Sequence, residues 1–239
     1  MPNFYQRSYN KELLDGDAIP FAHIAQNMRE LDVINHRLGG HRITIKGMQT
    51  LLKGKWNILN QAVTVVEIGC GGGDNLRELQ QWAARNNIPV QLTGIDINEE
   101  CIAFAQSQPR NKGIHFICSD YREVLFITKP QIIFSSLFCH HFTDAELVAQ
   151  LQWMQQNALI GFFINDLHRH PLAYYSIKLL TGLFSKSYLV KNDAPLSVLR
   201  GFVKRDWQRL MQRAGIHNYS CRWQWAFRWL VTSVHAKGK

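Results

Sequence analysis

Histidine and aspartate residues stand where two apolar runs of the sequence end. His140 and His141 follow the first run, and Asp166 and His168 follow the second. A neutral histidine accepts a proton near pH 7, so these side chains suit a general base acting on a hydroxyl, with a carboxylate to orient the ring. We rank His140, His141 and His168 as bases in that order and give Asp166 the orienting role. At least one of the two adjacent histidines is expected to face the pocket.

These runs are organised around residues 63–76. The stretch begins with β-branched apolar residues, which predicts a strand buried on both faces of a parallel sheet. It then breaks into closely spaced glycines, where the backbone turns tightly and a ligand can approach. Helical spacing follows, with Asp74 or Asn75 able to cap the helix. Strand, glycine loop and helix form the first unit of a doubly wound nucleotide-binding fold, whose ligand lies at the carboxyl end of the strand.

The rest of the chain alternates between strand and helix patterns. Further strands are predicted at 88–97, 114–118, 131–138 and 158–164, with an antiparallel hairpin at 221–234. Helices are predicted at 21–38, 45–59, 99–108, 145–156, 172–184 and 204–214. Residues 193–197 are predicted to form a turn. The alternation predicts a single α/β domain whose parallel strands end at a common edge.

Composition narrows the class of protein. The 239 residues, 46% hydrophobic and 19% charged, suffice for one globular domain. We expect neither a membrane-spanning helix nor a signal peptide, because no apolar run has the required length or position. Five scattered cysteines without a Cys-x-x-Cys pair predict reduced thiols and a cytoplasmic location. The net charge of +9 suits nucleic acid or an anionic membrane surface, but there is no dense basic block, so a solvated basic surface is favoured.

The glycine loop departs from the dinucleotide-binding pattern. G-x-G-x-x-G would place a glycine where Asp74 stands. Glu67 and Asp74 put carboxylates on both sides of the loop, which disfavours a pyrophosphate and favours a cation. Together with the terminal hairpin, this argues against a nicotinamide-dependent oxidoreductase.

Three short motifs resemble those of class I S-adenosylmethionine (SAM)-dependent methyltransferases: EIGCGGG at 67–73, DIN at 96–98 and SDY at 119–121. The resemblance implies a Rossmann-like seven-stranded sheet that binds SAM and releases S-adenosylhomocysteine (SAH). It places Asp96 on the ribose, although Asp96 could also cap the following helix, and it places Asp120 near the adenine. The cofactor-binding residues that it implies are Glu67, Gly69, Cys70, Gly71, Gly73, Asn75, Asp96, Ile97, Asp120, Tyr121 and Ser136.

The same resemblance implies a covered substrate pocket. Residues 1–60 would form an N-terminal helical cover in the same domain as the SAM-binding residues 61–239, with a lid over about 170–200. An apolar lid suggests a roomy, apolar pocket, although the stretch could instead pack in the core or dimerise. The substrate-binding candidates are His36, His41 and Tyr174.

A metal site is not predicted. Asp166, His168 and His170 have the spacing of ligands on an extended strand. A tetrahedral site needs a fourth group, and the sequence does not offer an obvious one nearby. A polar turn outweighs the metal interpretation, and a substrate-orienting or proton-accepting role for Asp166 or His168 is favoured.

The resemblance extends to four short strings: LGGHR at 38–42, SLFCHHF at 136–142, NDLHR at 165–169 and PLSV at 195–198. They look like a bacterial subgroup associated with polyketide or phenolic-lipid pathways. The implied reaction is in-line methyl transfer, O- rather than C-methylation, to a small apolar or aromatic acceptor by a monomer or homodimer. The alternatives are an RNA or protein methyltransferase, suggested by the charge, and a non-catalytic module that binds SAM or a nucleotide.

Overall fold

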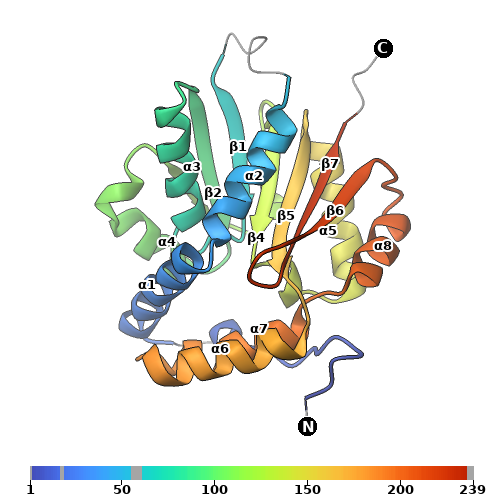
Figure 1. The fold of residues 1–239 in the computed structure, drawn as a ribbon. Coiled ribbons are helices and arrows are strands. Elements are labelled where there is room, and N and C mark those ends of the chain that lie inside the picture. The colour runs from blue at the N-terminus through green and yellow to red at the C-terminus, as the bar shows by residue number, and fades with distance from the viewer. Residues whose placement is uncertain (1, 17–18, 55–60, 236–239) are drawn as a thin grey trace.

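A computed structural model describes residues 2–16, 19–54 and 61–235. These residues form a seven-stranded sheet in the order β3-β2-β1-β4-β5-β7-β6 (Figure 1). The strands are β1 (Val63–Ile68), β2 (Val90–Asp96), β3 (His115–Cys118), β4 (Ile132–Ser136), β5 (Gly161–Leu167), β6 (Tyr219–Gln224) and β7 (Arg228–Val234). The first five are parallel, and β7 runs antiparallel between β5 and β6. The predicted seven-stranded α/β sheet is confirmed.

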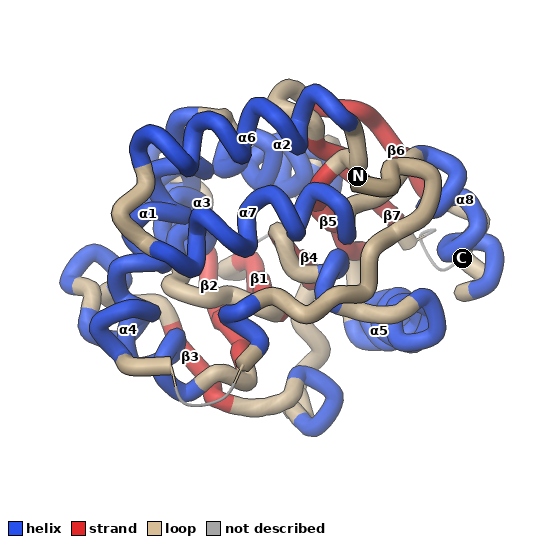
Figure 2. The backbone as a smooth tube through the Cα atoms, turned by 90° about the horizontal axis from the view of Figure 1, so that it is seen from below, coloured by secondary structure: helices blue, strands red, loops and turns tan. Residues whose placement is uncertain are grey.

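Helices cover both faces of the sheet and its carboxyl edge. They are α1 (Phe21–Arg37), α2 (Gly40–Leu52), α3 (Asp74–Arg85), α4 (Glu99–Ser107), α5 (Asp144–Asn157), α6 (Pro171–Phe184), α7 (Tyr188–Arg200) and α8 (Lys204–Arg213). One core cluster joins the sheet to α2, α3 and α4, and a second joins the opposite face to α5 and α8. Helices α6 and α7 lie side by side across the carboxyl edge (Figures 1 and 2).

Among the element boundaries that differ from the sequence prediction, three concern α2, β5 and α3. Helix α2 begins at Gly40 and not near 45, because Gly39 takes the left-handed conformation with φ of 76° and starts the helix earlier; the predicted end at 55–59 lies outside the described residues. Strand β5 runs to Leu167 and not to 164, because its ladder with β7 continues through Leu167 opposite Arg228. Helix α3 is preceded by Gly73, so Asp74 is its first residue and not its cap.

The predicted turn at 193–197 is wrong, because these residues lie inside α7. Pro195 costs α7 a hydrogen bond and crowds the carbonyl group one turn earlier, and burial of Leu189 and Val198 offsets this cost. The turn-forming residue Asp193 instead accepts hydrogen bonds from the backbone N–H groups of Leu13 and Leu14. The contact ties α7 to the N-terminal segment.

Candidate functional site

The glycine loop between β1 and α3 is closely packed. Gly69, Gly71 and Gly73 all have positive φ, at 67°, 49° and 74°. A Cβ added at Gly69 would lie 2.1 Å from the ring of Phe138, so the loop tolerates no side chain there. Phe138 follows Leu137, a bulky residue with φ of 53° at the end of β4. Such backbone strain gathers at functional sites, and here it turns the chain toward the loop.

Glu67 lies at the end of β1 and is almost completely buried. Its Oε1 accepts a hydrogen bond from Asn75 Nδ2, whose side chain also accepts one from Thr44. Its Oε2 has no hydrogen-bond partner among the described residues, and the same is true of Asn165 Oδ1 and Asp166 Oδ2 on β5. Burial, with a smaller contribution from Asp74, raises the pKa of Glu67. Unpartnered buried acceptors at this edge suit a ligand that brings donors or positive charge.

Asp96 ends β2 beside the loop. Its Oδ2 accepts the Gly71 N–H at 2.8 Å, and its Oδ1 accepts the Asn98 N–H at 2.9 Å. The cap of α4 is Asn98, which accepts the Cys101 N–H, so capping does not occupy Asp96. The next residue, Ile97, is 71% exposed. A carboxylate followed by an exposed apolar side chain could hold a ribose and one face of an adenine ring.

The other cofactor candidates lie in different surroundings. Both carboxylate oxygens of Asp120 accept hydrogen bonds from the side chain of Arg122, which would compete with an adenine amino group. Tyr121 packs in the core, its ring centroid 4.9 Å from that of Trp153. Cys70 is buried, and Ser136 accepts a hydrogen bond from Asn165.

His140 is buried between two carboxylates. Its Nδ1 lies 2.8 Å from Asp166 Oδ1, and its Nε2 lies 3.5 Å from Glu12 Oε1. Burial alone would lower the pKa of His140, but the two carboxylates outweigh it and raise the pKa to about 9. The expectation of a neutral imidazole at pH 7 is therefore wrong for His140 in this arrangement. With Glu12 present, the imidazolium is the stable form.

The other two candidate bases differ from His140 in their partners. His141 Nδ1 lies 2.9 Å from Asp15 Oδ1, and its ring centroid is 4.4 Å from that of His140. His168 does not join this pair, because its ring packs against Trp229 with centroids 5.1 Å apart. Burial, followed by the nearby charges of His170 and Arg169, lowers the pKa of His168 to about 4. His168 is thus neutral at pH 7 and lies among aromatic side chains.

Three residues that the sequence prediction missed hold the His140 turn in place. Glu12 approaches both His140 and His141. Arg200 donates hydrogen bonds to the carbonyl oxygens of both histidines. Arg7 donates to the His140 carbonyl and to Asp144. All three are at least 93% buried, a state that nothing in their local sequence indicates.

The substrate-binding candidates lie on three different helices, α1, α2 and α6. His36 is exposed, whereas His41 is buried with its Nε2 2.8 Å from Asp74 Oδ2. Tyr174 on α6 packs edge-on against Phe4. Within the described ranges, the side chains close enough to share a metal ion form three groups: Glu12, His140 and His141; His36, His41 and Glu78; and Asp32, His41 and Asp74. Asp166, His168 and His170, whose spacing would suit ligands on a strand, do not form such a group within these ranges.

Solved structures with a similar fold were compared with this chain. Magnesium protoporphyrin IX methyltransferase (ChlM) from Synechocystis PCC 6803, with bound SAH, has 15% identity and a TM-score of 0.55 over 84% of each chain. The plantazolicin methyltransferase BpumL, with a triazolic desmethylPZN analog and SAH, has 14% identity and a TM-score of 0.63 over 91% of this chain and 97% of that chain. A pericyclic reaction enzyme has 17% identity and a TM-score of 0.55, over 78% of this chain and only 46% of that chain. At these identities the likeness shows the fold alone.

A family model decides the assignment. No curated protein matches the sequence significantly. Residues 65–158 match the model of a methyltransferase domain, and this range contains the glycine loop, Asp96 and His140. Residues 65–158 therefore form a methyltransferase domain, which supports the class I SAM-dependent family. This result confirms the predicted family.

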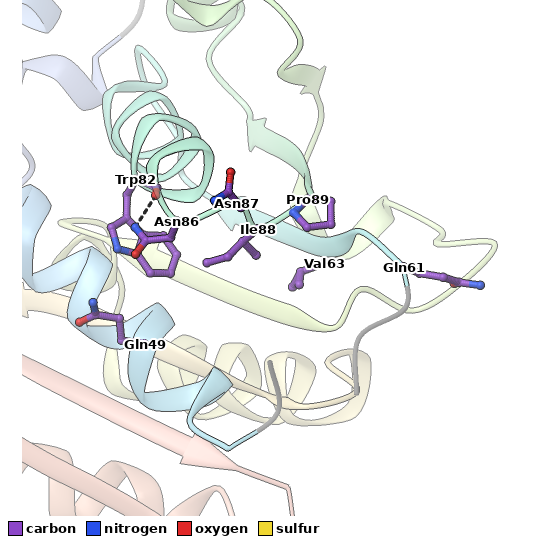
Figure 3. A pocket seen from close by; sticks show the side chains of 8 residues that line it. All are labelled: Gln49, Gln61, Val63, Trp82, Asn86, Asn87, Ile88 and Pro89. Carbon is purple, nitrogen blue, oxygen red and sulfur yellow. Dashed lines mark hydrogen bonds between the residues drawn. The ribbon is translucent and has the colours of Figure 1, made fainter. Parts of the chain in front are cut away.

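A cavity of about 370 Å³ lies at the opposite end of the methyltransferase sheet (Figure 3). It is lined by Gln49, Gln61, Val63, Trp82, Asn86, Asn87, Ile88 and Pro89. Val63 is the first residue of β1 and Pro89 precedes β2, so the cavity borders the amino ends of these strands. Ligands of doubly wound sheets bind at the carboxyl ends, and we therefore do not assign the methyltransferase site to this cavity.

The raised pKa of His140 predicts that the methyltransferase loses stability as pH rises. The pKa is about 9 in the folded protein, against 6.5 for an unperturbed histidine. Below the lower value both states are protonated and the stabilisation is complete; as pH rises to about 9 it is lost, by up to about 3 kcal/mol. Urea unfolding across this window should show the free-energy difference between wild type and His140→Gln shrinking with pH. Parallel pH dependences would contradict the assignment.

Proposed function

We propose that this methyltransferase transfers the methyl group of SAM to a hydroxyl of a small, largely apolar acceptor of phenolic or polyketide-derived structure. The observation that carries the proposal is the buried pair of His140 and Asp166, one turn beyond the Phe138 ring that packs on Gly69. The pair puts an acid–base group near the cofactor loop at the carboxyl edge of the sheet, where ligands of this fold bind.

The residues at this edge fit SAM. Asp96 offers acceptors for ribose hydroxyls, and Ile97 offers an exposed apolar surface for the adenine. The unpartnered Glu67 Oε2 and the glycine backbone suit the cationic amino-acid end of the ligand. When bound, SAM supplies an already activated methyl group, so the protein has mainly to exclude water and align the acceptor.

We assign the proton transfer to His140. Asp166 fixes the ring through Nδ1, which leaves Nε2 facing Glu12 at 3.5 Å. An acceptor hydroxyl that takes the place of the Glu12 carboxylate would remove one of the two charges that raise the pKa of His140. The pKa of His140 would then be lower, which favours the neutral ring, and Nε2 of the neutral ring could take up the proton of the acceptor hydroxyl. His141, hydrogen-bonded to Asp15, is the second candidate.

Aromatic side chains near the carboxyl edge favour an apolar acceptor. Tyr174 and Tyr175 of α6, together with Phe4, form an aromatic cluster at the carboxyl edge. The similar structures carry the names of a magnesium protoporphyrin IX methyltransferase and a plantazolicin methyltransferase, so methyltransferases named for different compounds share this fold. A non-catalytic SAM-binding protein is the second candidate, because Glu12 faces the base and Phe138 covers the loop.

The proposal is tested by calorimetric binding of SAH, with NADH in parallel, and by methyl transfer from labelled SAM to a panel of phenols and their non-phenolic analogues. We expect micromolar SAH binding, no NADH binding, and product only with acceptors that carry a hydroxyl. SAH binding with no turnover on any acceptor would favour the non-catalytic candidate. NADH binding in place of SAH would overturn the cofactor assignment.

A further inference from the structure

Helix α6 presents an apolar face to the outside. Leu172, Tyr175, Leu179 and Leu183 recur at helical spacing and are 56–67% exposed, and Phe184 at the end of the helix is 78% exposed. Of the residues of α6, only Ala173 and Thr181 are buried. A helix on the surface of a soluble domain normally presents polar side chains to the solvent, and α6 does the opposite.

The face lies at the carboxyl edge of the sheet, the same edge as the candidate site. Helix α6 runs beside α7 across the carboxyl edge of the sheet, away from both core layers (Figures 1 and 2). Tyr188, the first residue of α7, is also half exposed and continues the apolar surface. We propose that α6 binds the surface of an anionic lipid bilayer.

Charge favours a bilayer over a second copy of the chain. Residues 167–192 contain no Asp or Glu, whereas Lys178, Lys186 and Lys191 are all exposed. In a symmetric dimer the same patch would face itself, and these lysines would approach one another with no carboxylate from the segment between them. Anionic headgroups would pair with the lysines while the leucines and aromatic rings enter the headgroup boundary.

The helix would lie on the bilayer and not cross it. Across the part of the chain that the structure describes, none of the helices has the length and hydropathy that a membrane span requires. An interfacial helix needs only one apolar face with basic residues beside it, which α6 and the start of α7 provide.

The test is flotation of the full chain with vesicles of phosphatidylcholine alone or of equimolar phosphatidylcholine and phosphatidylglycerol. We expect binding to the anionic vesicles only, weakened by added salt. The double variant Leu179→Ser/Leu183→Ser should bind about ten-fold less, because it removes two side chains that would enter the bilayer. A control is Leu125→Ser/Ile127→Ser, which alters two aliphatic residues that are even more exposed, at 92% and 107%, but lie far from α6 in sequence. It should bind like wild type.

The proposal would be overturned if the wild-type protein did not bind anionic vesicles, or if both double variants lost vesicle binding to the same extent. Sedimentation without lipid tests the competing occupant: a dimer that the Leu179→Ser/Leu183→Ser change dissociates would mean that a second copy covers α6. Thermal unfolding of each variant verifies that it is folded. The vesicle assay needs neither SAM nor acceptor, so its result is independent of the proposed methyl transfer.

Discussion

His140→Gln is expected to lower methyl-transfer turnover by about 10²- to 10⁴-fold, the range typical for removal of a general base. The affinity for SAH should stay within about two-fold of wild type, because the loss falls on the chemical step and not on cofactor binding. The reason is geometric: Asp166 holds the ring 2.8 Å from its own carboxylate, and Gln cannot accept a proton from a hydroxyl in place of Nε2. Steady-state kinetics with the best phenolic acceptor measures the effect.

Stability must be measured on the same sample. Removing the imidazolium leaves the carboxylates of Asp166 and Glu12 without their shared partner, which destabilises a buried cluster. Thermal unfolding and SAH binding separate this effect from catalysis. His115→Gln, at an exposed position on β3, is the matched control and should retain full turnover. Asp166→Asn should also lower kcat, and the double variant should lose little more, because the two residues act as one unit.

If His140→Gln kept wild-type turnover while folded, the histidine of this pair would not be the base. His141→Gln would then be the informative variant, since His141 makes its own contact with Asp15. Loss of SAH binding in His140→Gln would instead mean that the turn after β4 supports the cofactor loop. The outcomes can be told apart because turnover alone falls if His140 is the base, neither constant changes if it is not, and the SAH affinity falls if the turn supports the cofactor loop.

Local patterns were sufficient to predict the sheet. The buried strands β1 and β4 each begin with β-branched and other apolar residues, and the glycine loop needs positive φ at Gly69, Gly71 and Gly73. Each of these signals is written within a few neighbouring residues. The capping box of α5 likewise involves only neighbouring residues, Thr143 and Glu146. Short-range chemistry therefore fixed the order of the elements.

The missed features depend on contacts between distant segments. The polar residues Asn165 and Asp166 suggested that β5 had ended, but both continue its ladder with β7. Glu12 belongs to a polar N-terminal stretch and becomes buried only because His140 and Arg200 surround it. A single sequence contains no periodicity that reveals such pairing. The charge state of His140 could not be predicted for the same reason, because one of the two carboxylates that set it comes from this stretch.

The last prediction concerns the cofactor. Asp96→Ala is expected to weaken SAH binding by about 100-fold, equivalent to about 3 kcal/mol, because two hydrogen bonds from ribose hydroxyls to a carboxylate would be lost. The same change removes the acceptor of the Gly71 N–H, so the glycine loop loses one of its anchors. Asp96→Asn keeps the shape and one acceptor oxygen and should show an intermediate loss. Calorimetry with SAH measures both variants.

Two further carboxylates make the test specific. Glu123→Ala, at an exposed position, should bind SAH like wild type. Asp120→Ala separates two roles: an adenine contact predicts a loss of about ten-fold, whereas engagement with Arg122 alone predicts no loss. Wild-type affinity in Asp96→Ala would exclude the ribose role. The substitution itself should not unfold α4, because Asn98 and not Asp96 caps this helix. The effect of Asp96 on binding can therefore be measured separately from any effect on the helix that follows it.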